Sequence, residues 1–299
     1  MLETIGAEHL ARRCQVALGY TAGVPQGGLY AERLADTIND ALKIIYARVK
    51  APQLRLFEKR TFRPPWDAVT SWQIGHECYF DGKYYVAKEA VSGGYPPPPE
   101  NPEVWVEKPL GDMVKFIALD QPWELHEIDP AGVDLKAFAF AKDPRMSDAA
   151  PITACAWMGD YPGGGTTRIL VSGEGVPPEV WVCFQPKTPK ISLEPWQEGQ
   201  TYYFNDRVLH NGDTWRCVNA QNAGEPGTGE SVRTPWERVR IPDMFTGLIR
   251  TYVRSAFLED EQGRAQMERR FDQELEELAH IYNGDTGHVD MAVIDGFED

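Results

Sequence analysis

Large apolar residues recur at helical spacing near the start of the sequence. Four of them follow one another at intervals of three or four positions: Leu34, Ile38, Leu42 and Ile45. This spacing places them on one face of an α-helix. The turn-rich stretch GVPQGG precedes them, and Pro52 lies just beyond them, as at ordinary helix boundaries. We therefore expect helices at residues 5–18 and 29–50.

The same spacing returns near the end of the sequence, between residues 242 and 283. A second stripe consists of Met267, Phe271, Leu275 and Leu278. Pro242 and Asp243 are a plausible start for this helical region, and Gly284 is a natural stop. Helices with one apolar face must bury that face, most economically against each other. The pattern predicts a helical docking domain made of residues 1–62 and 245–284.

Between these helical ends the pattern changes to short alternating or fully apolar runs. FIALD, LKAFAFA, RILVSG and EVWVCFQP are bounded by Asp, Pro and Gly, which is typical of short strands. We expect a central β-sandwich or barrel at residues 114–192. The predicted fold class is thus α+β, with terminal helices forming a base and β segments inserted between them.

A weak internal repeat flanks this central region. The turn-and-strand segments DGKYYVAK (81–88) and NGDTWRCV (211–218) lie 130 positions apart, and other residues match at the same offset. Trp105 meets Trp236 after a one-residue insertion. The sequence predicts two three-stranded modules, repeat 1 at 63–113 and repeat 2 at 193–244. The matches at the fixed offset include Pro65-Trp66 with Pro195-Trp196, Trp72 with Tyr202, Cys78 with Val208, and Tyr85 with Trp215.

Repeat 2 resembles the small carbohydrate-binding modules found beside chitinases and cellulases. The residues that carry the resemblance are Trp196, Gly199, Tyr202, Val208, Gly212, Trp215, Pro226 and Trp236. Repeat 1 departs from the pattern at Val69, where repeat 2 has Gly199. The resemblance implies three-stranded units with a tryptophan at each end. We expect Trp66, Trp105, Trp196 and Trp236 to fill the module cores.

The resemblance also implies where a sugar would bind: on adjacent exposed aromatic rings between the central strand and the Gly-x-x-Pro turn. The corresponding stretches here, AKEAVSGG (87–94) and CVNAQNAG (217–224), contain no aromatic residue. This favours a module that keeps its fold without its usual ligand surface. The candidate glycan or partner contacts are Trp72, Tyr84, Tyr95, Tyr202 and Trp215.

Composition and charge narrow the classes of function. The formal net charge is −15, and residues 243–299 alone hold 14 acidic against five basic side chains. Because nucleic-acid binding needs Lys and Arg to displace counterions, such a chain can surround DNA without adhering to it.

The five cysteines include no CxxC pair, so neither a zinc knuckle nor a disulfide framework is indicated. We expect no signal peptide, no membrane span and a loose acidic tail at 285–299.

No catalytic motif in the sequence is complete. GDYPGGGTTR (159–168) lacks the Gly-Lys-Ser/Thr ending of a phosphate loop, so a hairpin loop is the better reading. The six histidines show no metal-ligand spacing. His126 lies among acidic residues that either recruit a cation or form a solvated turn. No GxSxG elbow is present, and DTG at 285–287 stands without the second copy of an aspartic protease. We predict no enzymatic activity, cofactor or metal.

The terminal helical segments are similar to those of phage head-to-tail connector adaptors. YAERLADTINDALKIIYARV with LRLFEK, and YVRSAFLEDEQGRAQMERRFDQELEELAHIY, carry this similarity over about 80 residues. The similarity implies that the helices dock under a portal ring while a β domain faces the tail. The residues expected to mediate portal or subunit docking are Leu248, Tyr252, Met267, Phe271, Leu275 and Leu278.

These observations together predict a structural virion protein, assembled in the host cytoplasm. It would form a homo-oligomeric ring that joins the portal to tail or nozzle proteins and lines the exit channel for double-stranded DNA. The alternative is a carbohydrate-binding protein that attaches through its two modules to a glycan such as chitin. A glycan-processing accessory enzyme is a third, weaker reading.

Overall fold

The computed structural model describes residues 3–20, 28–51, 54–94, 96–119, 128, 133–157, 168–218, 221–222, 224–227 and 236–283. Within them the chain divides into two units. The first comprises the described residues of Met1–Leu54 and Thr188–Val289, and the second those of Arg55–Lys187. None of the described helices combines the length and the apolar character that a membrane span requires. The predicted tail at 285–299 and most of the glycine loop lie outside the described residues.

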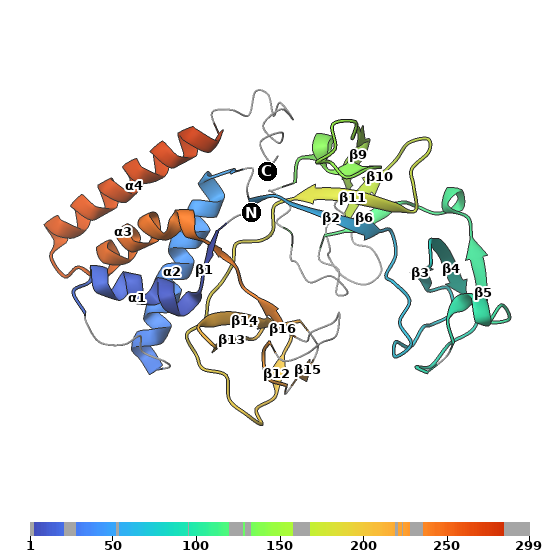
Figure 1. The fold of residues 1–299 in the computed structure, drawn as a ribbon, viewed down its shortest axis with the longest axis horizontal. Helices are drawn as coiled ribbons and strands as arrows, with labels where there is room; N and C mark the ends of the chain where they lie inside the picture. Colours follow the sequence, from blue (N-terminus) through green and yellow to red (C-terminus); the bar gives the residue numbers. More distant parts are fainter. Residues whose placement is uncertain are drawn as a thin grey trace, which may run out of the picture. The chain divides into compact units, whose positions relative to one another are not determined.

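Helices from both ends of the chain meet in the first unit. Their bounds are α1 (Ala7–Ala17), α2 (Gly28–Arg48), α3 (Thr246–Phe257) and α4 (Glu261–Asn283). The helix α3 contacts each of the other three and lies at the centre of the group (Figure 1). The helices predicted at residues 5–18 and 29–50 are confirmed, with ends that differ by one or two residues.

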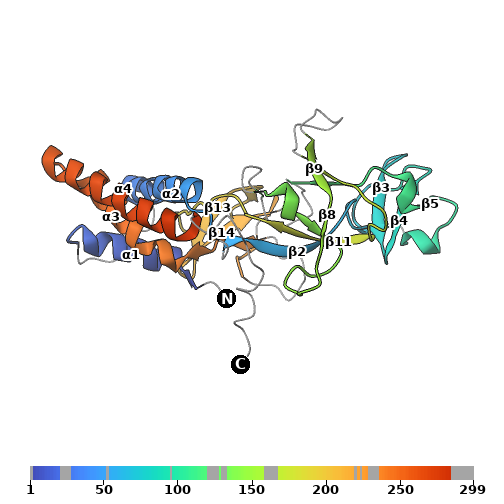
Figure 2. The ribbon, with the colours of Figure 1, turned by 90° about the horizontal axis from the view of Figure 1, so that it is seen from above.

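The apolar stripes of these helices form one core, as expected. Leu34, Ile38, Leu42 and Ile45 of α2 are completely buried. They share a core with Ile249 and Val253 of α3 and with Phe271 and Leu275 of α4. Figure 2 shows α3 and α4 running side by side. The predicted packing of the N-terminal helices against the C-terminal ones is therefore confirmed.

Repeat 2 belongs to the same unit as the helices. Its strands are β12 (Tyr202–Tyr203), β13 (Arg207–His210), β14 (Asp213–Cys217), β15 (Gln221–Asn222) and β16 (Trp236–Arg238). A short ladder between β1 (Thr4–Ile5) and β17 (Ile241–Pro242) joins the N-terminus to the segment that follows β16. At the start of α1, no side chain caps the helix. Instead the Glu8 N–H donates to the carbonyl of Gly212, in the hairpin turn, at 3.0 Å.

Repeat 1 lies in the second unit and has the same strand order. Its antiparallel sheet is formed by β3 (Glu77–Phe80), β4 (Lys83–Ala87) and β5 (Trp105–Lys108), and that of repeat 2 by β13, β14 and β16. In repeat 1, Cys78 pairs with Tyr85 and Ala87 pairs with Trp105. In repeat 2, Val208 pairs with Trp215 and Cys217 pairs with Trp236. The two modules thus share one register at the predicted offset.

The hairpin turns of the two modules also match in backbone conformation. Asp81 and Asn211 have φ angles of 45° and 49°, and the glycines that follow them have φ angles of 80° and 83°. Two consecutive positive φ angles define a type I′ turn, which favours Asp-Gly and Asn-Gly. The shared turn explains why Gly82 and Gly212 are identical in two segments that otherwise differ.

The repeats differ at two places. Gly199 adopts a φ of 78°, a left-handed conformation that a β-branched residue avoids, so Val69 at the equivalent position takes another backbone path. Trp72 bridges to Val91, whereas Tyr202 pairs with Asn222, one position further along. The inserted residue of repeat 2 therefore precedes Asn222, earlier than the sequence matches alone suggest.

Two small antiparallel sheets make up the rest of the second unit. One has the order β2 (Leu56–Thr61), β11 (Glu179–Phe184), β7 (Ala139–Phe140) and β8 (Pro151–Ile152). The other has the order β6 (Phe116–Ala118), β10 (Arg168–Val171) and β9 (Ala154–Trp157). Both sheets contribute residues to a single core, and neither closes on itself within the described residues. The barrel that we considered is therefore absent from this part of the chain.

The run LKAFAFA forms less strand than its alternation predicts. Leu135–Ala137 is a 3₁₀ helix, and only Ala139–Phe140 joins the sheet. The Asp134 carboxylate accepts a hydrogen bond from the Lys136 N–H at 3.0 Å. This side-chain cap stabilises a tight turn in competition with the strand.

We expect the helical core to be sensitive to truncation at α2. Leu42→Ala removes a completely buried side chain and should lower the free energy of unfolding by about 2–5 kcal/mol. Leu29→Ala, at a side chain that is 86% exposed, should change it by less than about 0.5 kcal/mol. Urea unfolding followed by helical circular dichroism measures both values, and equal effects would contradict the described core.

Candidate partner-binding surfaces

Most of the aromatic residues proposed as contacts lie inside the modules. Trp72 and Tyr202 are each 5% exposed. Each packs edge-to-face on the last tryptophan of its module, with centroids 5.8 Å apart for Trp72–Trp105 and 5.3 Å apart for Tyr202–Trp236. Their faces are therefore not free to stack on a ligand, and their role is in the module cores.

The predicted core tryptophans occupy equivalent positions in the two modules. Trp105 and Trp236 are fully buried. Trp66 and Trp196 are half-buried and pack edge-to-face on Phe80 and His210, which are equivalent residues of the two repeats. All four tryptophans therefore pack in the cores of their modules.

Tyr84 lies in a different core from the tryptophans of its own module. Its side chain is 2% exposed and packs with the central sheets of the second unit. Its hydroxyl donates to the Pro178 carbonyl at 2.6 Å and accepts from the Phe62 N–H at 3.0 Å. Burial raises the pKa of the Tyr84 hydroxyl, so it stays protonated. Tyr84, which we expected at the surface, therefore anchors repeat 1 to the central sheets.

The equivalent position in repeat 2 makes an equivalent contact. Thr214 is completely buried, and its hydroxyl donates to the Ser192 carbonyl at 2.9 Å and accepts from the Ser192 N–H at 3.1 Å. Leu209, paired with Thr214 across the hairpin, joins the helical core. Both modules are therefore attached to their surroundings by the same face of the hairpin.

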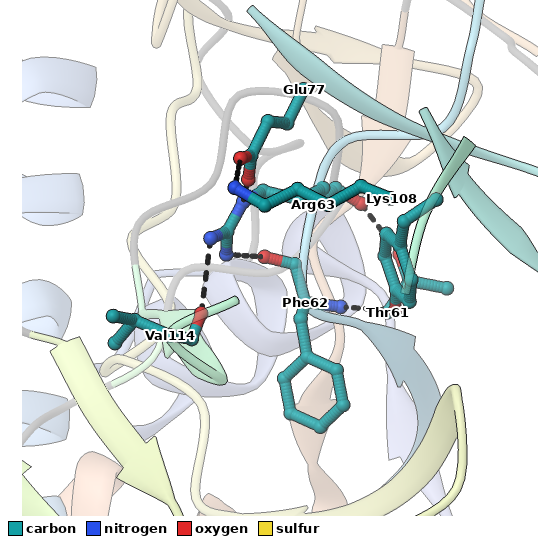
Figure 3. Close-up of polar contacts among 7 residues, drawn as sticks. Thr61, Phe62, Arg63, Glu77, Lys108 and Val114 are labelled. Carbon is teal, nitrogen blue, oxygen red and sulfur yellow. Dashed lines mark hydrogen bonds and ion pairs between the residues drawn. The ribbon is translucent and has the colours of Figure 1, made fainter. Parts of the chain in front are cut away.

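A charged cluster reinforces the attachment of repeat 1 (Figure 3). The Arg63 guanidinium donates to Glu77 at 2.5 Å, to the Phe62 carbonyl at 2.8 Å and to the Val114 carbonyl at 3.0 Å. Lys108 donates to the other Glu77 oxygen. Arg63 thus joins strand β3 to the segment that leads from repeat 1 into the central sheets.

The cluster keeps Glu77 ionised. Burial by itself would raise the pKa of this carboxyl, but hydrogen bonds and charge from Lys108 and Arg63 lower it below its ordinary value of 4.5. With a side chain only 16% exposed, Glu77 is a carboxylate that depends on both cations. The cluster is consequently an interaction that holds repeat 1 in place rather than an acid–base site.

The structure reveals exposed aromatic residues that the sequence interpretation missed. Tyr203 is 59% exposed and Phe204 is 49% exposed, next to each other in repeat 2. The equivalent residues of repeat 1 are Gln73 and Ile74, and Ile74 is 70% exposed. Their signal was the sequence YYF before Asn205, whose positive φ of 73° turns the chain at this point. Repeat 2 alone therefore presents two adjacent aromatic rings.

The other proposed contact residues have mixed positions. Trp215 is half-buried, and its indole N–H donates to the His210 carbonyl at 3.1 Å. Its ring lies against Gly227, where an added Cβ would come within 3.3 Å of it. Tyr95 lies outside the described residues. Only part of the Trp215 ring is thus available to a partner.

The proposed docking residues of the C-terminal helices face inward. Leu248, Phe271 and Leu275 are buried in the helical core. Tyr252, Met267 and Leu278 are half-buried, and Tyr252 packs edge-to-face on Phe271 with centroids 5.1 Å apart. These residues hold α4 on α3. Direct docking by them stays a prediction, whereas the remaining surface of α4 is largely exposed.

Within the described ranges, no three His, Cys, Asp or Glu side chains are grouped so that they could hold a metal ion. His126 lies outside those ranges.

Comparison of the chain with protein-family models, curated proteins and solved structures finds no match.

We expect the Glu77 cluster to make stability depend on pH. Glu77→Gln should lower the free energy of unfolding by about 1–3 kcal/mol near neutral pH, because Arg63 and Lys108 lose their carboxylate. Because the folded-state pKa of Glu77 is depressed, its contribution is present above pH 4.5 and is lost as the pH falls through the folded value. The difference between the two proteins should therefore shrink in acid.

Urea unfolding at several pH values, followed by tryptophan fluorescence, measures this difference. Glu107→Gln is the matched control, since its ion pair with Lys83 is half-exposed on both sides and should contribute little. A Glu77→Gln effect that is the same at every pH would rule out the proposed ionic role.

Proposed function

We propose that this chain is a non-enzymatic virion protein, a head-to-tail adaptor that assembles as a ring between the portal and the tail. The observation that supports this best is the single helical unit built from both ends of the chain, with α3 at its centre. A unit of this kind is a compact docking element from which the intervening β segments extend as insertions.

The exposed surface of α4 supports a contact with a neighbouring protein. Over its 23 residues only Phe271 and Leu275 are buried in the chain's own core. The remaining surface is rich in Arg and Glu and includes Ile281, which is 67% exposed. A surface of this kind can be covered by a second subunit or by the portal, with charged residues setting the choice of partner.

The acidity of the chain supports a position around DNA. A net charge of −15 repels phosphates, so a duplex inside such a ring would pass without being held. In the proposed ring, subunits pack laterally through their helical units. The two tryptophan-rich modules then decorate the outer rim.

The mass of the assembled chain tests this proposal. Native mass spectrometry of the purified protein, alone and with the portal of the same phage, should show a closed oligomer of one defined copy number. Raising the salt concentration should reduce the fraction of assembled protein, because it screens the charged surfaces that contribute to the contact. A protein that stays monomeric both alone and with the portal would contradict the adaptor role.

A second candidate function, carbohydrate binding, is favoured by one observation. Tyr203 and Phe204 present adjacent exposed rings on a module that resembles sugar-binding modules. Stacking of sugar rings on aromatic side chains is a plausible source of affinity at this position. The buried Trp72 and Tyr84 are unsuitable for such a contact.

Retention on chitin and cellulose tests the second candidate. If repeat 2 binds glycan, the unchanged protein should be retained, and Tyr203→Ala with Phe204→Ala should reduce retention at least tenfold. Gln73→Ala with Ile74→Ala changes the equivalent residues of repeat 1 and should have no effect. Absence of retention, or retention that the aromatic substitutions leave intact, would exclude this site.

A further inference from the structure

The helical unit contains a cleft of about 200 Å³ to which neither of the proposed functions assigns a role. It lies among the last turn of α1, the exposed side of α3 and the first half of α4. Its lining includes Ala17, Arg250, Arg254, Met267, Arg270 and Glu274. Three of these six residues are arginines, in a chain whose net charge is −15.

Two of the arginines have no carboxylate partner among the described residues. Arg250 and Arg254 are exposed, and neither lies within ion-pair distance of an acidic side chain in the part of the chain that the structure describes. They are four residues apart on α3, so they are neighbours on one helix face, where like charges repel. The twelve residues of α3 include no Asp or Glu to offset them.

The third arginine is already neutralised. Arg270 donates to Glu274 at 2.7 Å, and Thr251 donates to the other oxygen of the same carboxylate at 3.0 Å. This pair fixes one wall of the cleft and leaves its charge balanced. The excess charge of the cleft is therefore carried by Arg250 and Arg254, which are placed to receive an anion.

The surroundings favour the carboxylates of a peptide over the phosphates of a nucleic acid. Ala17 and Met267 supply apolar surface beside the arginines, as a peptide with mixed side chains requires. Several acidic residues of α4 stand beside the cleft in sequence, among them Glu268 and Asp272. A guanidinium binds a carboxylate or a phosphate through two parallel hydrogen bonds. The nearby carboxylates repel a long phosphate backbone, which carries a charge on every nucleotide, more strongly than a peptide whose acidic residues are separated by neutral ones.

Residues 284–299 of this chain have the matching composition. They contain five acidic residues and no Lys or Arg, and they also contain several apolar residues. They begin at the end of α4, which lies about 20 Å along the helix from Arg270 at 1.5 Å per residue. At about 3.3 Å per extended residue, the sixteen residues of this segment are long enough to span from the end of α4 to a neighbouring molecule.

We propose that the cleft formed by Arg250 and Arg254 binds residues 284–299 of a second copy of this chain. This inference rests on the ring proposed above and identifies one contact within it. A contact in which residues 284–299 of one copy enter a site on the next is heterologous, and repetition of such a contact closes a ring when the rotation permits. The contact is ionic and weakens as the salt concentration rises.

Two full-length variants test the contact. The first, Arg250→Glu with Arg254→Glu, removes the receiving site. The second, Asp290→Asn with Asp295→Asn, Glu298→Gln and Asp299→Asn, neutralises four of the five acidic side chains of the segment. Sedimentation velocity should show an oligomer for the unchanged chain and at least a tenfold loss of association for each variant. Circular dichroism and thermal unfolding should show that both remain folded.

An equimolar mixture of the two variants is the decisive sample. One variant keeps the segment and the other keeps the cleft, so the mixture should form a dimer and stop there. Lys190→Glu with Arg240→Glu is the control, because it reverses two exposed charges outside both the cleft and the four helices and should leave assembly unchanged.

The outcomes separate this contact from the ring itself. A ring that persists in both variants would overturn the contact and leave the adaptor proposal standing. Variants that fail to associate when mixed would also overturn it. An unchanged chain that is monomeric at every concentration and salt, both alone and with the portal, would refute both the ring and this contact.

Discussion

The burial of α3 against the other three helices is the constraint on which the first unit depends. Each terminal helix carries one apolar stripe, which can be buried only against another element. Because α1 and α2 come from the start of the chain and α3 and α4 from its end, satisfying these stripes brings residues 200 or more positions apart into one core. The chain between α2 and α3 must therefore run out of this helical core and come back to it, and it forms the β segments on the way.

The attachment of the two modules follows a shared physical rule. Each module packs one face of its hairpin into its own tryptophan core. The other face packs against the rest of its unit, which is the central sheets for repeat 1 and the helical core for repeat 2. Tyr84 in repeat 1 and Thr214 in repeat 2 each place a hydroxyl on a backbone carbonyl of the rest of the unit. The modules are thus fixed parts of their units, and the Arg63–Glu77–Lys108 cluster strengthens this for repeat 1.

The sequence predicts those features that local periodicity determines. The spacing of Leu34 to Ile45 predicts α2, and the fixed offset between the repeats predicts two hairpins with one register. The sequence does not tell which hairpin face meets another part of the chain, since Tyr84 and Tyr85 are adjacent tyrosines on opposite faces of one strand. The sequence YYF before Asn205 marks Tyr203 and Phe204 as a turn-flanking aromatic pair, but the structure is needed to show that both are exposed. The short 3₁₀ helix at Leu135–Ala137 depends on one side-chain cap that alternation does not encode.

We propose that this fold serves assembly rather than catalysis. Electron microscopy of the purified, assembled chain tests that claim most directly. Closed rings with a central opening wide enough for a DNA duplex are expected. Isolated single copies, or open filaments without a central channel, would contradict it.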